Sequence, residues 1–503
     1  MNRLIIAYHK RKAAILACLF LFVGAIPGLG SAGNHFEDMP EWYFDAPTQS
    51  AYELVLNLQL EEAHQIIPEP VTAQQHYVIA LAEALELLIT EDGEKYTEYE
   101  SRFTERLERK TSLNVPDDLF LQAEIRMQWT FIYLKFGHEF DAALNLRQAY
   151  LTIDEIRNRF PKFQSIKKTS GLLEVIIGSV PQKYNWVLSL LNMEGSTKTG
   201  LAELDYIRSS GSALAFEANL VHALIQGFLL QQPGQGVNEI NTLRTKHPKN
   251  RLALFLASAL SIKDNQSENA LKMLDSLSQN SVGIPLYYAD YLRGEIFLHK
   301  GEYLNSISSY RSFINHYNGQ NGVKDGYFKI GLCYWLNGNT NDAEEIFKQA
   351  KSRGKEASEA DKYAARSLAD DELPHIQLTK ARYATDGGYY DRAKQILELL
   401  QPKDIPTKRD QVEYAYRMAR LAHKINDTQN AKTFYQKSVT LSGDEDWYYA
   451  PNACLQLGYI LLNEGDTTLA KSYFTKALSY GKHEYKNSID SKAKSGLAQI
   501  KRK

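Results

Sequence analysis

The chain has 503 residues, of which 44% are hydrophobic, 23% charged and 11% aromatic, and only 15 are proline. This composition is globular, and it excludes wholesale disorder, a collagen-like repeat and a small disulfide scaffold. The 58 Lys and Arg residues nearly balance the 60 Asp and Glu residues, for a net charge of -2. With no run of like charge, a nucleic acid is not expected as a partner.

The first 32 residues have the features of a secretory signal. Basic residues up to Lys12 precede the apolar stretch 13–26, and small residues follow it up to Ala32. The apolar stretch is shorter than the roughly 20 residues that a membrane-spanning helix needs. We therefore expect cleavage after Ala32 and export to the periplasm or cell envelope. An uncleaved signal anchor remains the alternative, and would be the chain's one contact with a membrane. Lipid attachment at Cys18 is disfavoured, because most of the apolar stretch follows that cysteine.

A recurring unit lies in the C-terminal half, most clearly in residues 327–350 and 455–478. Each copy has a glycine in a first apolar stretch, a second glycine at its end, and Ala and Phe at helical spacing in a second stretch. The shared positions are Gly331, Gly338, Ala343, Phe347 and Ala350 in one copy, and Gly458, Gly465, Ala470, Phe474 and Ala477 in the other. A third copy keeps Gly294, Phe297, Gly301 and Tyr310, with Ser306 in place of the first alanine. This spacing resembles that of the tetratricopeptide repeat.

The repeated residues have a mechanical reason. Gly331 and Ala343 are small enough for two antiparallel helices to approach closely, while Phe347 fills the space between them, so bulkier residues would force the pair apart. Gly338 lies where the first helix must end in a left-handed turn. The resemblance implies an all-α fold, an α-α superhelix built from helical hairpins.

Weaker copies extend the pattern towards the N-terminus, to about residue 48. We expect three parts: a signal peptide (1–32), a divergent N-terminal helical region (33–210) and a tetratricopeptide-like array (211–503). The longest step between copies, from Ala343 to Ala393, contains a charged stretch that begins at Lys351. This stretch is interpreted as a solvated insertion, with a regulatory element as the alternative.

Residues 171–204 break the period, with glycines and Pro181 among apolar residues. Through Pro181, Gly195 and Gly200 the segment resembles the middle of a divergent tetratricopeptide family known from fungal inclusion-body clearance and its animal relatives. That resemblance implies a glycine-rich helix pair, and an adaptor rather than an enzyme. A bend of the array is expected near Pro181.

Signatures of catalysis and metal binding are missing from the sequence. No phosphate-binding glycine loop or nucleophile elbow lies in a strand-turn-helix context. Three scattered cysteines are too few for a zinc site, and the acidic clusters lie between helices, where acids commonly cap. No cofactor and no enzymatic activity are expected. Cys333 and Cys454 are expected to be buried and unpaired.

The concave surface of a superhelix is lined by fixed positions of the first helices, and in this chain those positions are rich in aromatic residues. Aromatic and Arg side chains favour interfaces, although the same positions also pack neighbouring helices. One basic patch is expected at Arg420, His423 and Lys424. The residues predicted to bind a partner are Tyr291, Phe328, Trp335, Tyr416, Arg420 and Tyr459.

The function favoured by the sequence is an exported, non-enzymatic scaffold that binds a protein or peptide in its concave groove. The alternative is an envelope glycan-binding protein with a tetratricopeptide framework. An enzyme built on a helical toroid is least favoured, because the acids are dispersed along the chain.

Overall fold

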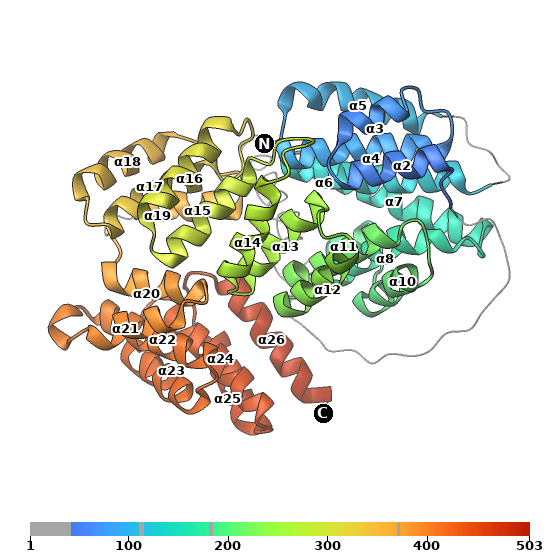
Figure 1. Ribbon diagram of the computed structural model, residues 1–503. Helices are drawn as coiled ribbons and strands as arrows, with labels where there is room; N and C mark the ends of the chain where they lie inside the picture. The colour runs from blue at the N-terminus through green and yellow to red at the C-terminus, as the bar shows by residue number, and fades with distance from the viewer. Residues whose placement is uncertain (1–41, 110–114, 181–184, 370–372, 503) are drawn as a thin grey trace, which may run out of the picture.

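The computed structural model describes residues 42–109, 115–180, 185–369 and 373–502, and all the regular structure in these ranges is helical. The first helices form the upper right part of Figure 1. They bury aromatic and aliphatic side chains around Trp42, Tyr77 and Phe120. Their bounds are α2 (Ala46–Leu56), α3 (Leu60–Ile66), α4 (Ala73–Thr90), α5 (Gly93–Leu107), α6 (Asp117–Phe136) and α7 (Glu139–Arg159).

The following helices include a tightly packed glycine pair. A Cβ atom placed on Gly200 would lie 2.4 Å from the carbonyl oxygen of Gly171, so only glycine permits this approach. The expected glycine-rich helix pair is present, whereas the bend expected near Pro181 lies outside the described residues. The bounds are a 3-10 turn (Gln164–Ile166), α8 (Lys167–Gly178), α9 (Asn185–Leu190), α10 (Thr197–Ser209), α11 (Ala215–Leu224), a π-helical turn (Ile225–Leu229) and α12 (Pro233–Lys246).

The remaining helices form the array of hairpins. They run from the centre of Figure 1 through its upper left to the lower left, and end in a helix that returns beneath the centre. Their bounds are α13 (Arg251–Lys263), α14 (Ser267–Ser278), α15 (Tyr288–Lys300), α16 (Tyr303–His316), α17 (Val323–Leu336), α18 (Thr340–Ser352), α19 (Glu359–Ala369), α20 (Ile376–Asp386), α21 (Tyr390–Leu399), a 3-10 turn (Pro402–Asp404), α22 (Lys408–Lys424), α23 (Thr428–Ser442), α24 (Tyr449–Asn463), α25 (Thr467–Ser479) and α26 (Lys486–Arg502).

The hairpins α17/α18 and α24/α25 confirm the role predicted for the small residues. A Cβ atom on Gly331 would lie 2.7 Å from the ring of Phe347, and one on Gly458 would lie 2.6 Å from Phe474. Gly338, in the turn between α17 and α18, has a φ of 86°, a left-handed conformation that glycine adopts without strain. A Cβ atom at this position would meet no neighbouring atom, so the backbone angle is the reason for glycine here.

The charged stretch after Lys351 is solvent-exposed, as predicted, only at its start, over residues 351–357, and the prediction of a solvated insertion is wrong for the rest. The rest forms the extra helix α19, which packs against α17 and α18. Asp361 on α19 is fully buried, and its carboxylate accepts hydrogen bonds from the backbone N–H groups of Gly322 (2.9 Å) and Asp325 (3.0 Å) in the first turn of α17. An acid placed at a helix start is stabilised by the unpaired N–H groups there.

The superhelix is wound so tightly that turns far apart in sequence touch. The carbonyl oxygen of Leu58 accepts from the N–H of Ile284 (2.9 Å), which joins the α2–α3 turn to the loop before α15. Asn265, at the α13–α14 turn, donates its side-chain N–H to the carbonyl oxygen of Asp386 at the end of α20. The end of α20 is therefore held against the turn between α13 and α14.

One hydrophobic cluster extends from Trp42 to Tyr383, so it includes residues on both sides of position 210. The division of the helical region at residue 210 stays a prediction. A second cluster occupies the last hairpins, from Val412 to Ala493. Among the described helices, none is long and apolar enough to span a membrane. The expected signal peptide at 1–32 lies outside the described residues.

Candidate interaction surface on the first helices

The first helices of the last hairpins form a continuous layer. α20 packs against α22, α22 against α24, and α24 against α26, while α21, α23 and α25 are the second helices of their pairs. The residues predicted to bind a partner lie on α15, α17, α22 and α24. The structure places Tyr416 and Arg420 one turn apart on α22, and Tyr459 on the neighbouring helix α24.

Three of the predicted partner-binding residues are buried and serve the packing of the array. Tyr291 donates its hydroxyl to Asp325 Oδ2 (2.6 Å), and Phe328 packs against Phe347 with 5.8 Å between ring centroids. Tyr416 is 3% exposed and lies against the rings of Tyr435, Tyr448 and Tyr449. These aromatic rings leave no surface for a partner, because neighbouring helices already cover them.

The other three predicted residues are half-buried, and each is engaged within the chain. Trp335 Nε1 donates to the carbonyl oxygen of Pro374 (3.0 Å). Tyr459 donates its hydroxyl to the backbone oxygen of Lys492 (2.8 Å), which fixes α26 to α24. Arg420 lies 3.5 Å from the Asp386 carboxylate on α20. Of these three, Arg420 and Tyr459 face neighbouring parts of the same layer, so they remain candidates for partner contact.

Arginines from α20 and α22 converge around Asp386. Arg420 and Arg382 lie 3.5 Å and 3.7 Å from this carboxylate, and Arg417 pairs with Glu413 at 2.6 Å. Burial alone would raise the pKa of Asp386, but the charges of Arg420 and Arg382 outweigh it and lower that pKa. Three guanidinium groups thus face two carboxylates, which leaves positive charge on the inner side of these helices.

Tyrosines surround the same arginines. Arg382 donates to the hydroxyl of Tyr363 on α19, and Arg417 donates to that of Tyr448, both at 3.2 Å. The guanidinium of Arg417 also lies 5.5 Å from the ring centroid of Tyr416, within cation–π range. Three tyrosines, Tyr363, Tyr416 and Tyr448, therefore contact arginines at this place.

Three lysines that come from separate helices join Arg420. They are Lys263 at the end of α13, the exposed Lys424 at the end of α22, and Lys492 on α26. Lys424 donates its ammonium to the side-chain oxygen of Asn265. Burial lowers the pKa of all three; the charge of Lys492 further lowers that of Lys263, and the charge of Arg420 further lowers those of Lys424 and Lys492. We refer to Lys263, Arg420, Lys424 and Lys492 as the basic set.

Sequence reasoning predicted half of this basic set. Arg420 and Lys424 formed part of the patch expected on α22, together with His423, whose pKa is lowered by burial and by these two neighbours. Lys263 and Lys492 were missed, because nothing near either residue in the sequence marks it as part of a site. Only the tight winding of the superhelix brings α13 and α26 to α22.

A comparison with protein families agrees with the helical hairpins described above. A model described as "Tetratricopeptide repeat" matches residues 325–353, 412–445 and 451–480, which include the hairpins α17/α18, α22/α23 and α24/α25. The chain therefore contains tetratricopeptide repeats in these three segments.

Several solved structures also match this chain at low sequence identity. A tetratricopeptide repeat protein from Parabacteroides merdae is 16% identical, with 56% of this chain and 98% of that chain covered and a TM-score of 0.25. The apo quorum sensor NprR from B. thuringiensis is 14% identical, with 72% and 98% covered and a TM-score of 0.35. Human IFIT1 with PPP-AAAA is 13% identical, with 87% and 95% covered and a TM-score of 0.31. A search of the curated proteins found no significant match.

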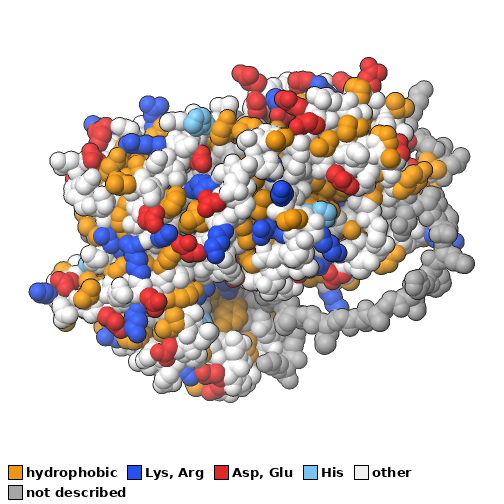
Figure 2. All heavy atoms as spheres, in the orientation of Figure 1, with side chains coloured by type: hydrophobic (Ala, Val, Ile, Leu, Met, Phe, Trp, Pro, Cys, Tyr) orange, Lys and Arg blue, Asp and Glu red, His pale blue; other side chains and the backbone are white. Residues whose placement is uncertain are grey.

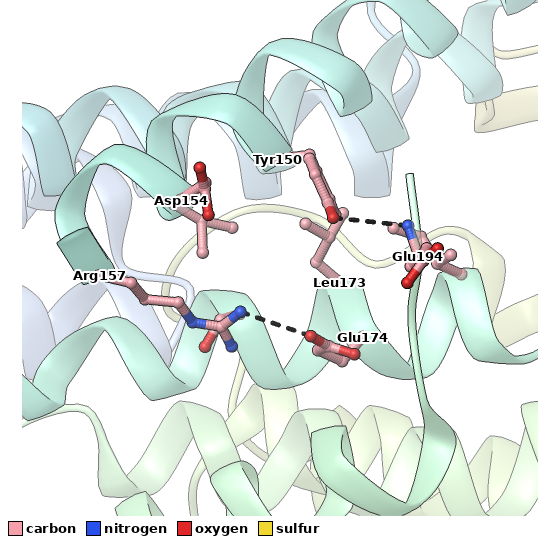
Figure 3. A pocket seen from close by; sticks show the side chains of 9 residues that line it. Tyr150, Asp154, Arg157, Leu173, Glu174 and Glu194 are labelled. Atoms are coloured by element: carbon pink, nitrogen blue, oxygen red, sulfur yellow. Dashed lines mark hydrogen bonds and ion pairs between the residues drawn. The ribbon is translucent and has the colours of Figure 1, made fainter. Parts of the chain in front are cut away.

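A small cavity lies elsewhere in the protein, between α7 and α8. Figure 3 shows Arg157 reaching from α7 towards Glu174 on α8, and Tyr150 opposite the backbone of Glu194. Its volume is about 20 Å³, room for roughly one water molecule. The cavity is therefore too small for an organic ligand. Among the described residues, no group of His, Cys, Asp or Glu side chains is placed to hold a metal ion.

Proposed function

We propose that this protein is an exported scaffold without catalytic activity, which binds a segment of a partner protein on the inner layer formed by α20, α22, α24 and α26. The observation that carries the proposal is the convergence of Arg382, Arg417 and Arg420 with tyrosines on adjacent first helices. Arginine and tyrosine are the residues that most often dominate the binding energy of protein interfaces.

The position of these side chains further supports a binding role. The side chains of Arg382 and Arg420 are 31% and 29% exposed, so they combine fixed ion pairs with a surface that a partner can reach. Side chains already held by neighbours lose little conformational freedom on binding. A preorganised layer of this kind suits recognition of an extended segment.

A photo-crosslinking experiment tests the binding surface. Tyr459 on α24 is replaced by p-benzoylphenylalanine, and the matched control carries the same change at the half-buried Tyr473 on the second helix α25. After irradiation of the source cells, mass spectrometry identifies the captured protein and the crosslinked segment. We expect one defined partner segment from Tyr459 and none from Tyr473. Equal capture from both positions, or glycan-array binding without protein capture, would contradict the proposal.

Export is proposed from the N-terminal sequence, in which basic residues precede an apolar stretch and small residues. N-terminal sequencing of the protein isolated from its cells tests this part. A mature chain that begins at Gly33 is expected, because Gly30 and Ala32 provide the small residues of a cleavage site. A chain that retains residues 1–32 in the membrane fraction would instead indicate the uncleaved anchor.

A further inference from the structure

The basic set consists of four cations from three helices that are pinned to one another. The hydroxyl of Tyr459 holds α26 through the backbone oxygen of Lys492. Asn265, at the end of α13, bonds both Lys424 on α22 and the backbone of Asp386 on α20. These contacts hold together the helices that carry the four charges, and one of them fixes the ammonium of Lys424 directly.

Carboxylates of the chain leave part of this charge unpaired. Asp386 is shared between Arg420 and Arg382. Among the described residues, no carboxylate oxygen lies within 4.0 Å of the ammonium groups of Lys263, Lys424 or Lys492. Lys263 instead lies over the ring of Phe228, 5.4 Å from its centroid. The ammonium of Lys424 bonds Asn265, two residues after Lys263, the charge of Lys492 acts on Lys263, and the charge of Arg420 acts on Lys424 and Lys492. None of the three ammonium groups has a carboxylate of the described residues in direct contact.

This local charge contrasts with the protein as a whole, whose net charge is -2. On the face shown in Figure 2, acidic side chains gather at the upper edge, over α5, whereas along the middle, where the upper and lower parts of the molecule meet, Lys and Arg side chains lie among acidic ones. A concentration of one sign of charge between low-dielectric walls attracts and orients ligands of the opposite sign.

We propose, as an extension of the function proposed above, that the basic set binds the carboxylate side chains of an acidic segment in the partner protein. A partner carboxylate supplies the counter-charge that Lys263, Lys424 and Lys492 lack. Two or three acidic residues in an extended segment are enough to reach helices that are already held together.

A polyphosphate chain fits the basic set less well than an acidic peptide. Asp264 and Asp386 lie among the cations, and their charges act on Lys424. They would repel phosphates that follow one another along a polyphosphate chain, whereas the carboxylates of a peptide lie at the ends of flexible side chains that can turn away from these two acids. Strong nucleic-acid binding also requires many neutralised phosphates, and the basic set has four cations.

Fluorescence anisotropy with fluorescein-labelled octa-glutamate tests the proposal on the full mature chain. Octa-glutamine of the same length serves as the neutral probe. The test variant is K424Q with K492Q, because glutamine at 424 keeps an N–H donor for Asn265. The matched control is K437Q with K471Q, two exposed lysines on the second helices α23 and α25. Circular dichroism confirms that both variants are folded.

We expect octa-glutamate to bind in preference to octa-glutamine, and to bind more weakly as salt is raised from 0.05 to 0.3 M. The test variant should lose about tenfold in affinity, or about 1.4 kcal/mol, while the control stays within twofold of wild type. The proposal is overturned if octa-glutamate binds no better than octa-glutamine, if both double variants lose affinity equally, or if an eight-nucleotide RNA binds more tightly at the same residues.

The two proposals fail in different ways. If Tyr459 still captures a partner segment in cells, and capture is unchanged in the K424Q and K492Q variant, the surface is correct and only the acidic chemistry is wrong. If Tyr459 captures no protein while octa-glutamate binds as expected, the basic set is an anion site and the scaffold function is wrong.

Discussion

Lys168 on α8 offers a strict test of the N-terminal packing. Its ammonium is buried, 2.7 Å from Glu124 Oε2, 2.9 Å from Glu217 Oε2 and 2.6 Å from the hydroxyl of Tyr77. These partners come from α6, α11 and α4, so a single charge joins four helices. Replacing Lys168 with Met keeps the length of the side chain but leaves two buried carboxylates without a cation.

The expected cost follows from the loss of one partner of a buried ion pair, which destabilises a protein by about 3–5 kcal/mol. It should also depend on pH. Burial raises the pKa of Glu124, Lys168 opposes that shift, and Glu217 adds to it, so K168M raises the pKa of Glu124 further. A carboxyl whose pKa is higher in the folded state than in the unfolded state destabilises the fold increasingly as pH rises between those two values. K168M should therefore be less destabilised at pH 5 than at pH 8.

Hydrogen exchange followed by mass spectrometry is the suitable assay, because a solenoid opens in parts and one global transition would average over them. Amides of α4, α6 and α8 should exchange faster in K168M, while those of α24 keep the wild-type rate. K168M combined with E217Q removes one uncompensated charge and should recover more than 1 kcal/mol of the loss. If K168M costs less than 1 kcal/mol at pH 8, or if its cost does not change with pH, the ion-paired network is refuted.

The remaining predictions concern the array. Replacing Gly331 with Ala should lower the free energy of unfolding by about 1–3 kcal/mol, because the new Cβ atom would lie 2.7 Å from the Phe347 ring. If the urea midpoint stays at the wild-type value, the two helices of the hairpin are packed more loosely than described. Replacing Asp361 with Ala should destabilise α17 and α19 by about 1–3 kcal/mol, because the backbone N–H groups of Gly322 and Asp325 lose their acceptor. Unchanged hydrogen exchange of the amides in the first turn of α17 would argue against this contact. Burial raises the pKa of both Cys333 and Cys454 to about 12, so peptide mapping after iodoacetamide should find both unmodified at pH 8 in the native chain, and rapid labelling of either would show that it is not buried.

The hairpin geometry could be predicted from sequence because its determinants are local. Gly331, Ala343 and Phe347 meet within one hairpin, and Gly338 requires a left-handed backbone at a fixed distance from them. The extra helix α19 could not be predicted in the same way. Its acidic residues have the composition of a solvated stretch, and Asp361 finds its partners on α17, in a preceding hairpin.

The candidate surface was harder to predict, because an aromatic residue that packs neighbouring helices and one that contacts a partner occupy the same positions in the repeat pattern. Tyr416 lies against three other tyrosines and is buried, whereas Tyr459 on α24 is half-buried and donates its hydroxyl to the backbone of α26. The difference depends on what covers each ring. That covering is set by the winding of the whole array and not by neighbouring residues.

Winding is itself constrained by buried charge. Lys168 lies between Glu124 and Glu217 in the N-terminal part, and in the array Lys329 lies between Glu295 and Asp325. The apolar faces of similar hairpins can pack in more than one order, but a buried charge without its partner is costly. In the N-terminal part, only an arrangement that brings α6 and α11 to α8 avoids that cost. In the array, Asp325 lies one turn from Lys329 on the same helix, so only Glu295 on α15 depends on how the helices pack. Buried charges therefore fix nearby helices, whereas hydrogen bonds such as the one from Asn265 to Asp386 join turns that are far apart in sequence.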